Sequence, residues 1–242
     1  MRHLARSLLL SVLLFCTPLL AMPQNDLLRL AVEYNMLGAE LNLMFFEPES
    51  REYAEAAARR YGSVSTMMPV WLASLPGDQA DRAGQAWKEL RDTLEGRGGL
   101  LQGYDATLNA RYTIANDELR EQLMSQPLLD SKALAQEQYA WLLTARVISA
   151  YMAVAAAPFG SFALSATDDD SRLSVTVMEL DQVWTGMVAA APESQRAQLV
   201  RTQRRWQFIR ETILRATQQS LPFIVRHHGD AILRELGDLA GS

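Results

Sequence analysis

"RVISAYMAVAAAPFGSFALSAT", residues 146–167, is one arginine followed by 21 residues without a charge. A run of this length is long enough to cross a bilayer as a helix. However, Pro158 and Gly160 interrupt its centre, serines dilute it, and no basic residue follows before Arg172. We therefore predict a buried helix with an apolar loop inside a water-soluble protein, which forms part of the wall of a binding site.

Helical periodicity extends over the rest of the chain. Ala, Leu, Met, Gln, Glu and Arg dominate the composition, and alternating β-branched residues are hard to find, which favours an all-α fold, a helical bundle. Apolar residues recur every three or four positions from 25 to 46 and predict the first helix. Further helices are expected at about 50–74, at 80–125 with an interruption or bend at 96–99, at 131–157 with Asp130 or Ser131 as its cap, at 167–191, and from 194 until Pro222 and Gly229 break the end.

The N-terminus predicts export. Arg2 and Arg6 precede an apolar run over residues 8–20, and Ala21 follows before the sequence turns polar. This is the arrangement of a secretory signal peptide with cleavage after Ala21. The apolar core is short for a permanent membrane span, although an uncleaved anchor is the alternative. We therefore expect a signal peptide over residues 1–21.

Composition narrows the compartment and the class of partner. Removing Arg2 and Arg6 leaves 21 of the 23 basic residues against 28 acidic ones, a formal charge of −7. An acidic domain does not attract phosphate backbones through its net field, so no nucleic-acid partner is expected. Cys16 is the only cysteine and leaves with the signal peptide, so an oxidising compartment would not harm the mature chain. We expect a periplasmic protein without a stable membrane span.

Three short motifs recur in the same order in the two halves of the chain: R-x4-Y at 29–34 and 146–151, V-W at 70–71 and 183–184, and W-x3-R-[DE]-T at 87–93 and 206–212. We interpret them as an internal duplication, with one three-helix unit over residues 22–126 and a related unit over 127–242, packed together. Chance and helical periodicity are the alternative. Trp87 and Trp206 are then expected to be equivalent core anchors. Arg91 and Arg210, four residues further on, are expected to lie beside their rings.

Arg146 faces the apolar side of its predicted helix. The equivalent Arg29 has Glu33 four residues further on, whereas an alanine stands at that position after Arg146. A buried guanidinium without a partner would cost several kcal/mol, so an anionic group should meet it. We expect a carboxylate from a neighbouring helix, with Glu179 and Asp181 as candidates, or a bound small anion. A side chain that reaches solvent along the apolar surface is the third interpretation.

The segment LAVEYNMLGAELNLMFF, residues 30–46, carries N-x-x-G at Asn35 and Gly38. It resembles the ligand-box helix of the type IV pili methyl-accepting chemotaxis transducer N-terminal domain, a family of periplasmic helical sensors. The arginine that this family carries two or three residues after the glycine is absent, so the resemblance does not imply nitrate recognition. It implies that Asn35 and Gly38 are ligand-binding residues. Arg146 and Tyr151, which frame the second R-x4-Y motif, complete the predicted ligand site.

No catalytic or metal-binding pattern stands out in the mature sequence. Its two histidines, His227 and His228, are adjacent and would point about 100° apart on a helix, which makes a poor chelating pair. No nucleophile elbow, phosphate loop, dinucleotide fingerprint or H-E-x-x-H motif is present. The acidic run at residues 168–170 is expected to cap a helix. We expect no catalytic residue, no metal and no cofactor.

These features predict a non-enzymatic periplasmic helical bundle. We expect it to bind a small ligand, such as an anion, or an envelope protein partner, within a sensory or envelope system. The alternative is a structural or assembly factor whose helices pair with another envelope protein. A closed apolar pocket around Arg146 would favour the ligand binder, and a broad exposed patch of Met, Trp and Phe would favour the assembly factor.

Overall fold

The computed structural model describes residues 21–47, 49–95, 106–156, 166–216, 218 and 220–241. Regular structure in these residues is entirely helical, which confirms the predicted all-α bundle. The elements are α2 (Gln24–Phe46), α3 (Arg51–Ser74), α4 (Gly77–Glu95), α5 (Ala106–Met124), the 3-10 helix η1 (Pro127–Leu129), α6 (Gln136–Ala156), α7 (Ala166–Ala190), α8 (Glu193–Leu214) and α9 (Pro222–Ala240). Among them, none is both long enough and apolar enough to cross a membrane. Residues 1–20 of the predicted signal peptide lie outside the described residues.

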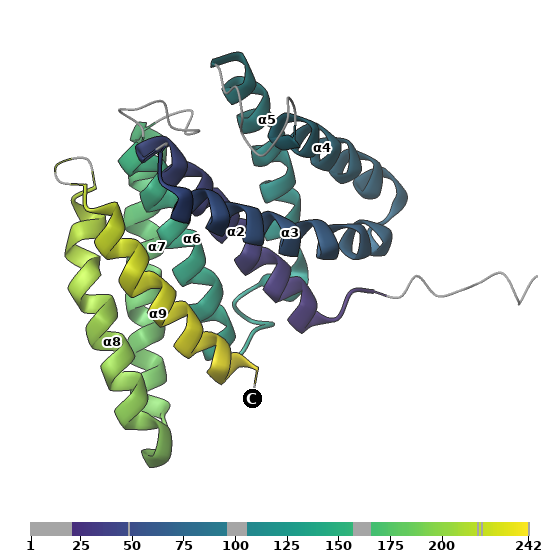
Figure 1. The fold of residues 1–242 in the computed structure, drawn as a ribbon. Coiled ribbons are helices and arrows are strands. Elements are labelled where there is room, and N and C mark those ends of the chain that lie inside the picture. The colour runs from purple at the N-terminus through teal and green to yellow at the C-terminus, as the bar shows by residue number, and fades with distance from the viewer. Residues whose placement is uncertain are drawn as a thin grey trace, which may run out of the picture.

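α6 is the central helix of the bundle. It packs against α2, α7 and α9, and α2 and α9 run in opposite directions over it (Figure 1). Leu143, Val147, Ile148 and Tyr151 are fully buried at these contacts. The uncharged stretch therefore begins as a largely buried helix, as predicted, with burial described as far as Ala155; the predicted apolar loop lies outside the described residues.

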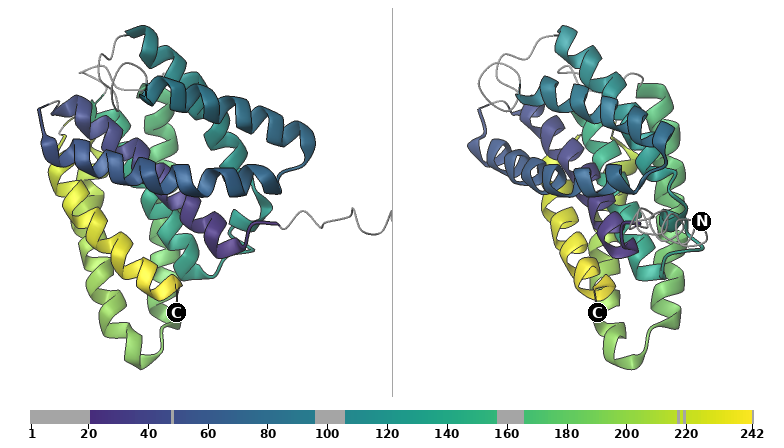
Figure 2. Two further views of the ribbon diagram at one scale, coloured as in Figure 1. Left: turned by 45° about the vertical axis from the view of Figure 1, so that its right-hand side comes forward. Right: turned by 90° about the vertical axis from the view of Figure 1, so that its right-hand side faces the viewer.

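α4 and α5 form a pair that stands apart from α8 and α9, as the two views of Figure 2 show. Of the two outcomes predicted at residues 96–99, the interruption is correct and the bend is wrong, because α4 ends at Glu95 and α5 packs back against it. The intervening segment contains four glycines, each of which costs a helix roughly 1 kcal/mol relative to alanine. Both helices carry a buried leucine row, Leu90 and Leu94 in α4 and Leu119 and Leu123 in α5, so a packed pair keeps these leucines from water.

The predicted ends of two other helices are also wrong. α6 begins at Gln136 rather than after Asp130 or Ser131, since the Asp130 carboxylate accepts a hydrogen bond from Lys132 N (2.8 Å) in the preceding turn. Pro222 does not end a helix but begins α9, where a proline needs no hydrogen-bonded N–H. Gly229 lies inside α9.

Each half of the described chain contains four α-helices, α2–α5 and α6–α9, instead of the three that were predicted. In both halves the predicted third helix is two helices. In each half, every helix packs against the next one along the chain. The first helices of the two halves, α2 and α6, also pack against each other. The internal duplication itself stays a prediction.

Gly229 lets α9 approach α6 closely, because a Cβ at this position would lie 2.5 Å from Ile148 Cδ1 in the core. We expect Gly229→Ala to lower the free energy of unfolding by about 1 kcal/mol despite its better helix propensity, since overpacking outweighs that gain. Urea unfolding followed by circular dichroism measures this. Ile148→Val removes the obstructing methyl group, so Gly229→Ala should cost less in that background. Equal costs in the two backgrounds would contradict the close contact, and Gly62→Ala, with open space at its Cβ, is the stabilising control.

Candidate functional site

An ion network around Arg226 joins α2, α3 and α9. The Arg226 guanidinium donates from Nε to Glu40 Oε1 (3.2 Å) and from Nη1 to Glu52 Oε1 (2.7 Å). Its Nε also lies 4.0 Å from Asp230 Oδ2, and its Cζ lies 5.1 Å from the centre of the Tyr53 ring, a cation–π distance. Three carboxylates share one guanidinium, so the network has an excess of negative charge.

Glu40 is the buried member of this network. Its side chain is 2% exposed, and Oε2 has no hydrogen-bond partner among the described residues. Burial raises the pKa of Glu40, the charge of Arg226 opposes that rise, and the charge of Asp230 adds to it. Burial lowers the pKa of Arg226, but the carboxylates outweigh burial and the net pKa is raised. Arg226 therefore stabilises the ionised form of Glu40, and Glu40 stabilises the charge of Arg226.

A cavity of about 700 Å³ lies next to this network, between the first half of α2 and the second half of α9. Its floor is apolar, because Leu28, Val32 and Leu233 are buried there. Trp141 of α6 supplies an aromatic wall. Asp230 belongs to both the cavity lining and the Arg226 network, so the two features are continuous. The volume is within the range of sites that hold small ligands.

Charged side chains of both signs also line the cavity: Asp26, Arg29, Glu33, Arg60, Asp230, Arg234 and Asp238. Arg60 Nη1 donates to Glu33 Oε1 (2.8 Å), so these two charges neutralise each other. Two acids and two bases make no ion pair within the described part of the chain: Asp26, Arg29, Arg234 and Asp238. All four are exposed, so the cavity has an apolar floor and a rim of unpaired charge.

Asn35 and Gly38, which the resemblance implies as ligand residues, lie on the inner side of α2. Asn35 Nδ2 donates to Ala31 O (2.7 Å) within its own helix. Gly38 allows α2 to approach α6, since a Cβ there would lie 3.1 Å from Ser149 Oγ. Neither residue lines the cavity. Both have a packing role in the structure, and their role in ligand binding stays a prediction.

Arg146 is half-buried on α6 and does not line the cavity. Its predicted pairing with Glu179 or Asp181 is wrong: Glu179 accepts a hydrogen bond from the Tyr139 hydroxyl, and Asp181 binds two side chains of α8. Burial and the bond to Glu179 raise the pKa of Tyr139 to about 12, and the charge of Arg146 opposes this rise. Arg146 thus lies near a tyrosine–carboxylate pair, without an ion pair to any described residue.

Tyr151, the fourth predicted ligand residue, anchors the segment between α8 and α9. Its side chain is fully buried, and its hydroxyl oxygen accepts a hydrogen bond from Leu221 N (2.7 Å). Burial raises the pKa of this phenol, and the bond from Leu221 opposes the rise. The contact holds the residue before Pro222, where α9 begins.

Trp87 and Trp206 are both buried, but the arginines that follow them differ. Trp87 packs against Tyr61 with 6.1 Å between ring centres, whereas Arg91 is exposed. No cation–π contact joins Arg91 or Arg210 to its tryptophan, and both pairs lie in described helices. Both tryptophans are therefore buried, as predicted, but neither arginine stacks on its tryptophan ring.

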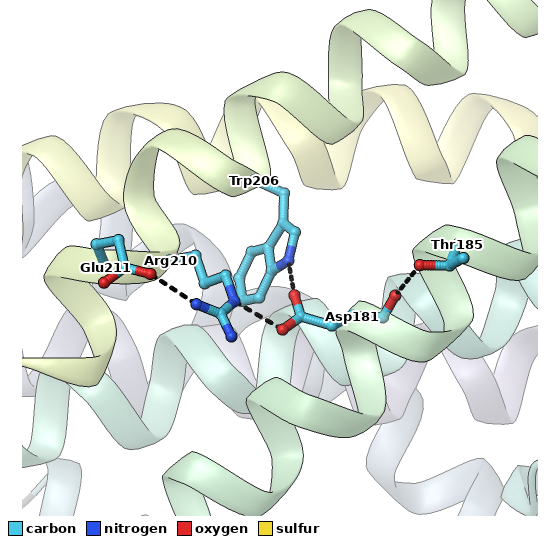
Figure 3. A network of polar contacts seen from close by, with 5 residues as sticks. All are labelled: Asp181, Thr185, Trp206, Arg210 and Glu211. Carbon is cyan, nitrogen blue, oxygen red and sulfur yellow. Dashed lines mark hydrogen bonds and ion pairs between the residues drawn. The ribbon is translucent and has the colours of Figure 1, made fainter.

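Trp206 and Arg210 share one carboxylate of α7. Trp206 Nε1 donates to Asp181 Oδ1 (2.7 Å), and Arg210 Nε donates to Asp181 Oδ2 (2.6 Å), as Figure 3 shows. Arg210 Nη1 also donates to the exposed Glu211 (2.6 Å). The bond to Asp181 raises the pKa of Arg210. Asp181 therefore ties α7 to α8 and satisfies a buried indole N–H.

The described residues hold no group of three or more side chains arranged to bind a metal. His227 and His228 have 5.2 Å between ring centres, and Phe208 packs edge-on against His228 (4.9 Å). Burial lowers the pKa of His228, and the charges of His227 and Arg205 add to that effect. The surroundings of His228 therefore favour its neutral form.

The sequence does not single out Glu40 or Arg226 as site residues. One signal was available: the residues three and four positions from Glu40 are all apolar, namely Met36, Leu37, Leu43 and Met44. A carboxylate on such a helix face needs a buried partner. No comparable signal marks Arg226, because its partners Glu40 and Glu52 lie 186 and 174 residues away along the chain.

Comparison with known proteins gives no relative with such a site. No family model matches the chain, no curated protein matches it, and no solved structure matches it. The resemblance to the chemotaxis transducer domain stays a prediction.

Proposed function

We propose that this chain is an exported, non-enzymatic helical-bundle protein that binds a small ligand in the cavity between α2 and α9, within a periplasmic sensory or envelope system. The cavity itself carries the proposal, with its volume of about 700 Å³, its apolar floor and its unpaired rim charges. Small-molecule sites have this form, an apolar lining with a few polar groups that orient the ligand.

Gly237 lines the cavity beside Trp141, so a substitution at this position probes the cavity directly. A Cβ at position 237 would lie 3.4 Å from Trp141 Cε2 and Cζ2, and both residues line the cavity. A longer side chain at this position would therefore take up cavity space in front of the ring.

Gly237→Leu is expected to abolish ligand binding while the protein stays folded, because the new side chain fills the cavity and improves helix propensity. A thermal-shift screen of small organic molecules and inorganic anions measures this. At least one compound should raise the melting temperature of the wild-type protein in a saturable manner. The same compound should have no effect on Gly237→Leu.

Gly62→Leu is the matched control, since Gly62 lies inside α3 with open space at its Cβ. It makes the same chemical change away from the cavity, so the ligand should stabilise it as much as wild type. Absence of any stabilising compound for wild type, or equal stabilisation of Gly237→Leu, would exclude the cavity as a ligand site.

The alternative function, an envelope assembly factor, is favoured by apolar side chains that stand in solvent. Val175 and Met178 of α7 are 58% and 54% exposed, and Phe208 of α8 is 61% exposed. Exposed apolar groups of this kind are found at protein contacts when they form a continuous patch. Light scattering of the purified protein shows whether they join copies of the chain.

A further inference from the structure

We infer that the ligand of the α2–α9 cavity is a zwitterion of the amino-acid or betaine class, held by its carboxylate at Arg29 and Arg234 and by its ammonium group at Asp26 and Asp238. This inference rests on the proposed ligand-binding function and adds the class of ligand.

The rim charges come in matched sets from the two walls. α2 contributes Asp26 and Arg29, and α9 contributes Arg234 and Asp238, so each wall carries one acid and one base. Here none of the four has an ion pair among the described residues, although all line the same cavity.

A ligand with a single charge would be repelled by the two rim side chains that carry the same sign of charge. An anion would gain the two arginines but meet the two aspartates, and a cation would face the reverse. Like charges in close contact cost free energy, and opposite charges stabilise each other. A ligand that carries both charges gains from all four side chains, which is why the rim favours a zwitterion.

At the end of the cavity next to the Arg226 network, the lining charges are already paired within the protein. Glu33 and Arg60 already form an ion pair (2.8 Å), and Asp230 lies within 4.0 Å of Arg226 in the network beyond. These charges are engaged within the protein. The unpaired charges therefore lie toward the other end, where the start of α2 and the end of α9 line the cavity.

The floor suits the remainder of such a molecule. Leu28, Val32 and Leu233 are buried and offer an apolar surface to an aliphatic side chain. Trp141 also lines the cavity, and tryptophan is the side chain whose ring best attracts an organic ammonium ion. An amino acid or betaine presents these chemical features together within a volume that the cavity accommodates.

Isothermal titration of the purified protein with the standard L-amino acids, the dipeptide Ala-Leu and glycine betaine tests the inference. At least one should bind. Analogues of the binder that lack only the carboxylate or only the ammonium group should bind about tenfold more weakly or worse, since a charged hydrogen bond contributes roughly 1.5 kcal/mol or more. For leucine these analogues are 3-methylbutylamine and 4-methylpentanoate.

Paired variants assign each charge. Arg29→Gln with Arg234→Gln should remove the preference for the zwitterion over its amine analogue. Asp26→Asn with Asp238→Asn should remove the preference over the acid analogue. All four side chains are exposed, so the variants should fold, and their melting curves verify this.

Asp81→Asn with Arg82→Gln is the control, because both residues are exposed on α4 and neither lines the cavity. It should leave both preferences unchanged. Failure of every zwitterion to bind, or equal binding of a single-charge analogue, overturns the inference. The proposed function fails separately, when no compound of any class gives a stabilisation that Gly237→Leu removes.

Discussion

Arg226→Gln is expected to lower the free energy of unfolding by about 3 kcal/mol at neutral pH, because it leaves the buried Glu40 carboxylate without its counter-charge. Glu40 is 2% exposed, and Asp230 adds to its electrostatic cost. Urea unfolding followed by circular dichroism measures the loss. Arg51→Gln is the matched control: it breaks an exposed ion pair with Glu55 (2.7 Å) and should cost less than about 0.5 kcal/mol.

The pH dependence of this loss has a definite sign. Folding raises the pKa of Glu40, so the stability that the protonated form contributes is fully present below the ordinary carboxyl pKa and is lost as pH rises through the folded-state pKa. Arg226 opposes that rise, so Arg226→Gln raises the pKa of Glu40 further. The deficit of the variant relative to wild type should therefore grow with pH across this window.

The double variant Glu40→Gln/Arg226→Gln should recover most of the lost stability, because no unpaired charge then remains buried at position 40. It should also lose the pH-dependent part of the deficit that Glu40 causes. A double variant as unstable as Arg226→Gln alone would show that the guanidinium stabilises α9 through Glu52 or Tyr53 instead.

Asp181→Ala is expected to lower the free energy of unfolding by about 2 kcal/mol, since it leaves the N–H of a buried indole without an acceptor. Trp206 is 1% exposed, and both oxygens of Asp181 accept hydrogen bonds from α8. Urea unfolding monitored by tryptophan fluorescence measures the change. Trp206→Phe removes the donor, so Asp181→Ala should cost less in that background.

Glu211→Ala is the control for Asp181→Ala, because Glu211 also binds Arg210 but is exposed and accepts no bond from the indole. We expect it to cost less than about 0.5 kcal/mol. Equal effects of the two substitutions would mean that Arg210, and not the satisfied indole N–H, determines the contribution of Asp181.

Local sequence pattern is sufficient to predict a helix when its apolar periodicity is uninterrupted. The bounds predicted for the first helix, 25–46, lie within one residue of α2, and the end predicted at Ala157 lies within one residue of the end of α6. Both helices have apolar residues at three- and four-residue spacing and a proline soon after their end. Such signals need no information about distant parts of the chain.

The errors in the predicted helix ends arise where one local sequence signal is compatible with two different tertiary arrangements. Pro222 ends one helix pattern but also begins a helix well, and the structure has it at the first turn of α9. Gly229 is a weak helix residue by propensity, yet α9 continues through it because Ile148 packs against its bare Cα. Contact with α6, which no local pattern contains, decides the second case.

The candidate site depends even more on tertiary structure. Asn35 and Gly38 form a recognisable pattern, and in the structure they serve contacts of α2 with itself and with α6. The cavity instead combines the start of α2 with the end of α9, the first and last helices of the described chain. Its residues are individually ordinary exposed charges and buried leucines, so none of them stands out in the sequence.

Sequence pattern alone predicts the helices and the burial of α6 after Arg146, which the structure describes as far as Ala155, because periodicity and hydrophobicity act over a few turns. Which charges are neutralised and which remain unpaired depends on how the helices pack. Glu40 finds Arg226 because α2 and α9 meet at one end, whereas Arg29 and Asp238 line an open cavity at the other. Ion pairing depends on a separation of a few ångströms between side chains, and only helix packing sets that separation.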